Sequence, residues 1–252
     1  MRNYFRFEMR AVCRAVFVLL ACSAVLGAQD DDPFDEPYDR WAVGIRFGFL
    51  FTDLMQGGSN DTIIDTDPFL LASEFSSAPK KRFFIGPSAQ FNIKPRIGIN
   101  AEFVTREVEF TRETSLRGAD RFGNLEFISS ESTRTRARYW DMPIQVRYYF
   151  GDPGRPRAYV GAGGVFRFVT NLRANLDTVD AEGTEKTKNV DGEVSNKNPI
   201  GGIGSIGVQL TDDIGIKVEI EGRYTYWLDR AFAIGFSNSA QSQVEVAIGF
   251  SF

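Results

Sequence analysis

The stretch GIKVEIEGRYTYW, Gly215 to Trp227, places two kinds of side chain at alternate positions. Apolar and aromatic residues occupy one set: Ile216, Val218, Ile220, Tyr224 and Tyr226. Charged residues occupy the other: Lys217, Glu219, Glu221 and Arg223. Successive side chains of a β-strand point to opposite faces, so this pattern predicts a strand with one apolar and one charged face. In a soluble sheet the apolar face would be buried against a protein core. In a membrane barrel the same face would contact lipid.

The same alternation predicts seven further strands, at 41–51, 82–93, 97–106, 139–150, 157–169, 200–210 and 242–252. The connections between them alternate in length. Those at 94–96, 151–156 and 211–213 are short, whereas the gaps near 52–81, 113–135, 170–199 and 228–241 are long and polar and predict irregular loops. Eight strands running up and down would place every short turn at one end and every long loop at the other. Outer-membrane barrels have this asymmetry.

The sequence therefore predicts an all-β fold, an eight-stranded antiparallel up-and-down transmembrane β-barrel. A membrane-spanning strand needs about 9–11 residues, and each candidate is at least that long. The strands would have to close into a ring, because an open edge leaves backbone groups unpaired in hydrocarbon. The alternative is a soluble periplasmic barrel whose apolar interior binds an apolar ligand, and alternation by itself does not exclude it.

The N-terminal 28 residues have the pattern of a secretory signal peptide. A basic front precedes the apolar run AVFVLLACSAVLGA, Ala15 to Ala28, which ends in small residues and is too short for a stable membrane anchor. LLAC, Leu19 to Cys22, leaves open a lipoprotein signal. Cleavage after Ala28 would remove both cysteines, Cys13 and Cys22, so we expect no disulfide. We divide the chain into a signal peptide (1–28), an acidic periplasmic linker (29–40) and a barrel domain (41–252), and predict a location in the bacterial outer membrane.

The composition also excludes several classes of function. Removing the signal takes away four Arg and one Glu, so the formal net charge changes from −4 to −7, and nucleic acid is not an expected partner. Histidine is absent. This absence excludes histidine-dependent nucleophilic catalysis and histidine zinc sites. We expect neither an enzyme nor a cofactor or metal site.

The charged face predicts a network inside the barrel. Five basic residues (Arg46, Arg147, Arg167, Lys217 and Arg223) and five acidic residues (Glu102, Asp141, Glu219, Glu221 and Glu245) fall on it. The interior of an eight-stranded barrel is just wide enough for side chains to fill, and an unpaired buried charge costs several kcal/mol. We therefore expect a salt-bridged plug. A gate whose ion pairs exchange partners and admit ions is the alternative.

YWDMPIQVRYYF (Tyr139 to Phe150), a short Gly-Pro turn and AYVGAGG resemble the outer-membrane β-barrel domain family, which includes PorT-like proteins and OmpA-like small barrels. The residues that carry this resemblance are Trp140, Asp141, Pro143 and Arg147. It implies an integral outer-membrane protein. The terminal strand, with Phe250 and Phe252, resembles the signal read by the barrel-assembly machinery. The peptidoglycan-binding domain of OmpA-type proteins is expected to be absent. Pro87 and Pro143 fall inside predicted strands and each removes one ladder donor, so we expect a bulge at one or both.

Together these features predict a monomer with a structural role or a role in recognition through its long loops. Expected partners are outer-membrane lipids and lipopolysaccharide, and a protein bound at the loops. A narrow channel for ions or small solutes, or a component of a secretion apparatus, is the alternative. The sequence identifies neither the partner nor any gating stimulus. Six arginines cluster around the second long loop: Arg112, Arg117, Arg121, Arg134, Arg136 and Arg138. They could contact lipid phosphates or an acidic partner, or pair with local acids such as Glu113 and Glu131.

Overall fold

The computed structural model describes residues 40–64, 70–77, 82–119, 125–152, 155–212, 214–234 and 237–252. The expected signal peptide and nearly all of the expected linker lie outside these ranges, so both stay predictions. Within the described ranges no helix is long and apolar enough to cross a bilayer.

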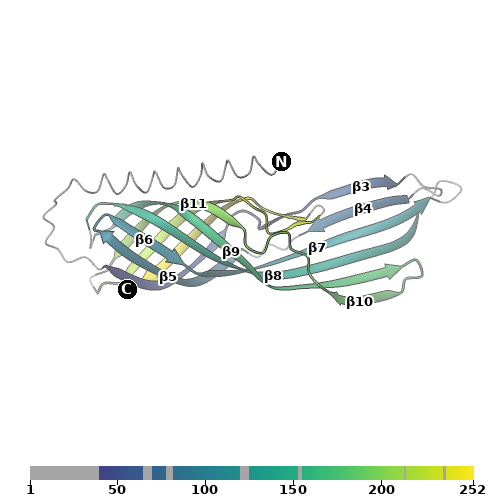
Figure 1. The fold of residues 1–252 in the computed structure, drawn as a ribbon, viewed down its shortest axis with the longest axis horizontal. Coiled ribbons are helices and arrows are strands. Elements are labelled where there is room, and N and C mark those ends of the chain that lie inside the picture. Colours follow the sequence, from purple (N-terminus) through teal and green to yellow (C-terminus); the bar gives the residue numbers. More distant parts are fainter. Residues whose placement is uncertain are drawn as a thin grey trace. The chain divides into compact units, whose positions relative to one another are not determined.

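Eight antiparallel strands form a closed barrel (Figure 1). They are β1 (Trp41–Leu50), β5 (Phe83–Lys94), β6 with β7 (Ile97–Glu102 and Val104–Ala119), β8 (Leu125–Phe150), β9 (Arg157–Asp180), β11 (Ile200–Thr211), β12 (Lys217–Trp227) and β15 (Ser242–Ser251). Each pairs with the next in this order, and β15 pairs with β1. Phe252 and Val43 complete the closure by exchanging two backbone hydrogen bonds of 3.0 Å. The eight predicted strands and the predicted fold class are confirmed.

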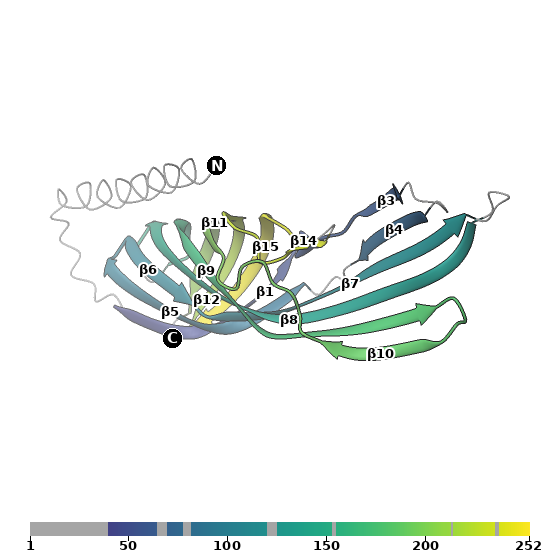
Figure 2. The ribbon, with the colours of Figure 1, turned by 45° about the vertical axis from the view of Figure 1, so that its right-hand side comes forward.

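Three strands continue far beyond the barrel, and here the expectation of long irregular loops is wrong. Strand β8 has 26 residues and β9 has 24, and they stay paired up to Ser129 and Asp180. Above the ring, β4 (Leu70–Ser77) replaces β5 beside β7, and β10 (Glu185–Val190) replaces β11 beside β9. With β3 (Ser59–Ile64) the sheet order is β3-β4-β7-β8-β9-β10. We call this six-stranded continuation of the barrel wall the arm (Figures 1 and 2).

Pro87 and Pro143 lie on either side of a single break in the third strand of the barrel, at Phe103 between β6 and β7. Pro87 stands opposite Phe103, and Pro143 stands beside Glu102 on the other neighbouring strand. The register with both neighbours is the same before and after the break, so the expected bulge at either proline is wrong. Because Pro87 has no N–H, it cannot donate a hydrogen bond to Phe103. The backbone bond between the two residues is the one that Phe103 N donates to Pro87 O, at 3.0 Å.

Several glycines allow the strands of the wall to approach closely. A Cβ at Gly163 would lie 1.9 Å from the carbonyl oxygen of Ile144, and one at Gly44 would lie 1.9 Å from that of Phe250. A side chain at either position would push neighbouring strands apart. Close contact between backbones therefore explains the glycines at positions 44 and 163.

Candidate functional site

The two faces of β12 differ in which side of the barrel wall they occupy. Lys217, Glu219, Glu221 and Arg223 are buried inside the barrel, with at most 5% of each exposed. On the opposite face Ile216 is 40% and Ile220 53% exposed. The ionised side chains therefore point inward and the apolar ones outward. This arrangement excludes the soluble barrel with an apolar interior.

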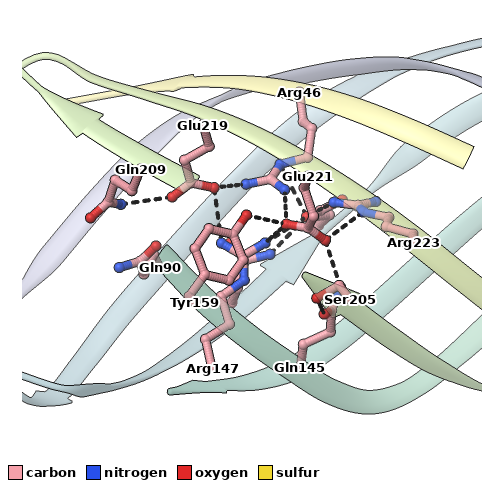
Figure 3. A network of polar contacts seen from close by, with 12 residues as sticks. Arg46, Gln90, Gln145, Arg147, Tyr159, Ser205, Gln209, Glu219, Glu221 and Arg223 are labelled. Carbon is pink, nitrogen blue, oxygen red and sulfur yellow. Dashed lines mark hydrogen bonds and ion pairs between the residues drawn. The ribbon is translucent and has the colours of Figure 1, made fainter. Parts of the chain in front are cut away.

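Glu221 is the centre of the interior network (Figure 3). Its Oε2 accepts hydrogen bonds from Arg46 Nη1 at 2.6 Å, from Tyr159 Oη at 2.5 Å and from Arg147. Its Oε1 accepts one from Arg223 Nε at 2.7 Å. Three guanidinium groups from three strands, β1, β8 and β12, therefore meet on one carboxylate.

Two further carboxylates, Glu219 and Glu102, pair with the same arginines, and Glu219 is labelled in Figure 3. Glu219 pairs with Arg46 and with Arg147 Nη1, the latter at 2.9 Å, and accepts a bond of 2.8 Å from Gln209 Nε2. Glu102 pairs with Arg46 Nε at 3.1 Å and with Arg223 Nη2 at 2.5 Å. Each of the three arginines is shared by at least two carboxylates, and these ion pairs connect four strands, β1, β6, β8 and β12, through their interior side chains.

A second group of charges lies nearer the arm. Arg167 binds both oxygens of Asp141, at 2.6 and 2.8 Å. Arg106 bridges Asp141 Oδ2 at 2.8 Å and Glu245 Oε2 at 3.1 Å. Arg223 Nη1 lies 3.8 Å from Glu245 Oε1, which links the two groups. The structure thus brings together nine of the ten predicted network residues, and the tenth, Lys217, is buried in the same lumen.

Arg106 was missed by the sequence analysis, although its position carried a signal. It lies on the same alternating face as Glu102, four residues further along the third barrel strand. Aromatic rings complete the packing of the arginines: the Arg167 guanidinium lies 4.1 Å from the ring centroid of Tyr139 and 3.9 Å from that of Trp227. Flat cations stacked on rings fill a narrow lumen with few voids.

An apolar cap closes the lumen on the side of the arm, and the sequence did not predict it. Phe232, from the connection between β12 and β15, is fully buried and packs on Phe110 and Tyr139, with ring centroids 5.1 and 6.2 Å away. Leu54 and Met55, from the connection after β1, join the same cluster. Residues from two connections therefore fold back over the charged layer.

The interior offers little room for a ligand. A pocket of about 10 Å³ lies beside Arg46, Gln90 and Glu219, which is room for about one water molecule. Glu219 and Glu221, the two carboxylates on β12, are both held by arginines. Among the described residues no group of three acidic or sulfur-bearing side chains is placed to hold a metal ion.

The family-motif and terminal residues divide between the two faces of the wall, with Asp141, Pro143 and Arg147 on the interior face and Trp140, Phe250 and Phe252 on the outer one. Trp140 stacks on Phe103 at 4.9 Å, whereas Asp141 and Arg147 belong to the interior network. Phe250 is 45% and Phe252 76% exposed on the outside of the closing strand. Their reading by the assembly machinery stays a prediction.

The arm carries a groove on the face that continues the barrel interior. It has a volume of about 280 Å³. Its apolar lining residues are Phe110, Ala174, Leu176 and Val190, and its polar ones are Arg112, Glu131, Thr133, Thr135, Asp191 and Glu193. Of the six arginines noted in the sequence, Arg112 lies here, and Arg121 is outside the described residues.

Comparison with known proteins agrees with this architecture. Residues 28–232 match the family described as outer membrane protein beta-barrel domain. Comparison with the curated protein sequences finds no match.

One similar solved structure is Neisserial surface protein A, with 12% identity, a TM-score of 0.39 and coverage of 86% of this chain and 98% of that one. Another is Ail of Yersinia pestis bound to a heparin analogue, with 8% identity, a TM-score of 0.33 and coverage of 85% of this chain and 100% of that one. A third is the N-terminal barrel domain of Pseudomonas aeruginosa OprF, with 10% identity, a TM-score of 0.30 and coverage of 85% of this chain and 98% of that one. The family match covers most of the sequence, and the fold it describes is the one observed: this chain belongs to the outer membrane protein beta-barrel domain family.

Proposed function

We propose that this protein is a closed outer-membrane anchor that presents a recognition surface on its arm. The length of β8 carries this proposal. A membrane-spanning strand needs about 9–11 residues, whereas β8 has 26. At about 3.3 Å per residue and a tilt of about 40°, the remaining part of the strand would reach on the order of 40 Å beyond the hydrocarbon core. Because the longer connections of such barrels face outward, the arm would stand in the external medium.

The filled lumen supports an anchor in preference to a channel. The ten predicted ionised residues, Arg106 and an apolar cap occupy the space that a pore would need. Moving any one arginine of the central layer would break at least two ion pairs with buried carboxylates. Breaking a buried pair costs about 3–5 kcal/mol, so thermal re-pairing to open a path is disfavoured.

The groove on the arm supplies a surface suited to recognition. Its apolar lining residues would bury part of a ligand, and its three carboxylates outnumber its single guanidinium. The hydroxyl-bearing Thr135 is 4% exposed and lines the groove. This balance of charge favours a partner that presents a lysine or arginine side chain on an extended segment.

Site-specific photo-crosslinking in intact cells tests the proposal. The photoreactive group is placed at Thr133 in the groove, and at Ala162, on the outer face of the barrel, as the matched control. Recognition at the arm predicts a discrete protein adduct from position 133 and none from 162. Substitution of Glu131, Asp191 and Glu193 by Gln should weaken that adduct, because the carboxylates would no longer attract a cationic side chain.

A measurement of conductance distinguishes a closed anchor from a channel. In planar bilayers the native protein should give no single-channel events, and so should a variant in which 113–132 is replaced by Asn-Gly, which joins the paired residues Arg112 and Thr133 by a tight turn. The shortened variant should also lose the adduct at a groove position. Regular conductance steps from native protein, together with equal adducts from positions 133 and 162, would contradict the proposal.

A further inference from the structure

The outward face of β8 changes from apolar to cationic at one point. From Phe150 to Trp140 its outward side chains are apolar or aromatic, and the next three outward positions are Arg138, Arg136 and Arg134. The side chains of these arginines are 41%, 58% and 51% exposed. On the outward face of β8 the apolar band therefore ends at Trp140, and the next three outward side chains carry exposed guanidinium groups.

A bulge in β9 adds a fourth arginine to this face. Below the bulge the odd-numbered residues of β9, such as Arg167, point inward. The register with β8 shifts between Arg136 and Arg138, and Asn171, in the inserted part of β9, has φ +51°. A bulge re-aims the side chains that follow it. Arg173 consequently points outward and lies opposite Arg136.

We call Arg134, Arg136, Arg138 and Arg173 the arginine cluster. Two carboxylates on β7 accompany it: Glu107 pairs with Arg138 at 3.0 Å, and Glu109 is shared by Arg134 and Arg136. Four guanidinium groups against two carboxylates leave a net charge of +2. Arg173 is exposed and makes no ion pair within the described part of the chain.

The cluster begins at the height of lipid headgroups. Two residues of a strand advance about 6.7 Å, and a barrel strand is tilted by about 40°. Arg138, Arg136 and Arg134 are therefore about 5, 10 and 15 Å above Trp140, which marks the end of the apolar band, and Arg173 is level with Arg136. The polar layer of a bilayer leaflet is about 5–7 Å thick. A guanidinium side chain at this height reaches into that layer.

We propose that the arginine cluster binds the phosphate groups of a lipid in the outer leaflet. Guanidinium groups bind phosphate oxygens in pairs, and a charge excess of two matches a headgroup with two phosphate groups. The aromatic row just below, formed by Phe103, Trp140 and Phe168, would hold the start of the acyl chains. The barrel fixes the height of the cluster, so the ligand is a membrane lipid and not a free phosphate ion.

Native mass spectrometry of the folded protein in a non-ionic detergent tests this site. Diphosphoryl lipid A, dephosphorylated lipid A and inorganic phosphate are titrated separately, and the bound fraction gives an affinity for each. The variants are Arg173→Gln, which breaks no recorded ion pair, and Arg136→Gln combined with Arg173→Gln. Arg155→Gln, exposed in the turn at the opposite end of the barrel, is the control. Heat-modifiable migration verifies that each variant is folded.

The expected loss of affinity for diphosphoryl lipid A is about fivefold for Arg173→Gln and about 25-fold for the double variant, from the attraction of each basic residue to an anionic lipid surface. Arg155→Gln should bind as the native protein does. The site is refuted if dephosphorylated lipid A binds equally well, if the control loses as much affinity as Arg173→Gln, or if inorganic phosphate alone occupies the protein at the same concentrations.

Discussion

The substitution Glu221→Gln tests whether the interior network stabilises the barrel. Glutamine has nearly the same shape as glutamate but is neutral, so the change removes charge without opening a cavity. The three guanidinium groups of Arg46, Arg147 and Arg223 would then share Glu219 and Glu102, and Arg223 would keep Glu245 at 3.8 Å. Tyr159 would keep a carbonyl acceptor.

The magnitude follows from the cost of leaving a buried charge without its partner. Breaking one buried pair costs about 3–5 kcal/mol. Glu221 serves three arginines, but each keeps two other carboxylates within 4 Å, so we expect a loss of about 4 kcal/mol for the whole change, as for one broken pair. The matched control is Asp53→Asn, because Asp53 is half exposed and pairs with Arg82 at 3.2 Å. An exposed pair is worth about 0–1 kcal/mol.

Equilibrium unfolding of the refolded protein in phosphatidylcholine vesicles, followed by tryptophan fluorescence in urea, measures both losses. The double variant Glu221→Gln, Arg223→Gln should lose less than the sum of its single variants, because removing both partners leaves fewer charges unpaired. A loss for Glu221→Gln no larger than that for Asp53→Asn would refute the account of the network.

Three further predictions concern the wall and the cap. Ile220→Arg, on the lipid face, should reduce the free energy of unfolding in vesicles by about 2–4 kcal/mol, and an unchanged value would contradict a lipid-facing position. Phe232→Ala should cost about 3–5 kcal/mol, because it empties the centre of the cap, while conductance in planar bilayers stays near zero because the charged layer remains. Gly163→Ala should lower the folded fraction on a gel-shift assay, since its Cβ would lie 1.9 Å from the oxygen of Ile144, whereas a Cβ at Gly164 meets nothing nearer than 3.9 Å and Gly164→Ala should fold normally.

The barrel was predictable from sequence because lipid and lumen impose opposite demands on alternate residues. Each spanning segment, such as Lys217–Trp227, carries that contrast over its whole length. The same contrast placed the ten predicted charges, but not Arg106, on the interior face, since an ionised side chain in a spanning strand has no other place than the lumen. Which of them pair was not predictable, because the partners are brought together by closure of the ring.

The arm was not predictable because both of its faces meet water. On β8 the outer part reads LEFISSESTRTRAR, Leu125 to Arg138, in which polar residues occupy both sets of alternate positions. Because the two faces do not differ in polarity, the sequence shows no alternation of polar and apolar residues, and the segment resembles a loop. The cap was missed for a different reason: Phe232 lies in a connection, and its burial depends on contacts with distant strands.

The orientation of the apolar face is the central claim, and a spin label at position 220 tests it most directly. The protein with Cys13 and Cys22 replaced by Ser and with Ile220→Cys is labelled and placed in vesicles, and collision rates with oxygen and with a water-soluble nickel chelate are measured by electron paramagnetic resonance. A side chain in hydrocarbon predicts frequent collisions with oxygen and almost none with nickel. Collisions dominated by nickel, or protection from both reagents as in a dry protein core, would contradict the account.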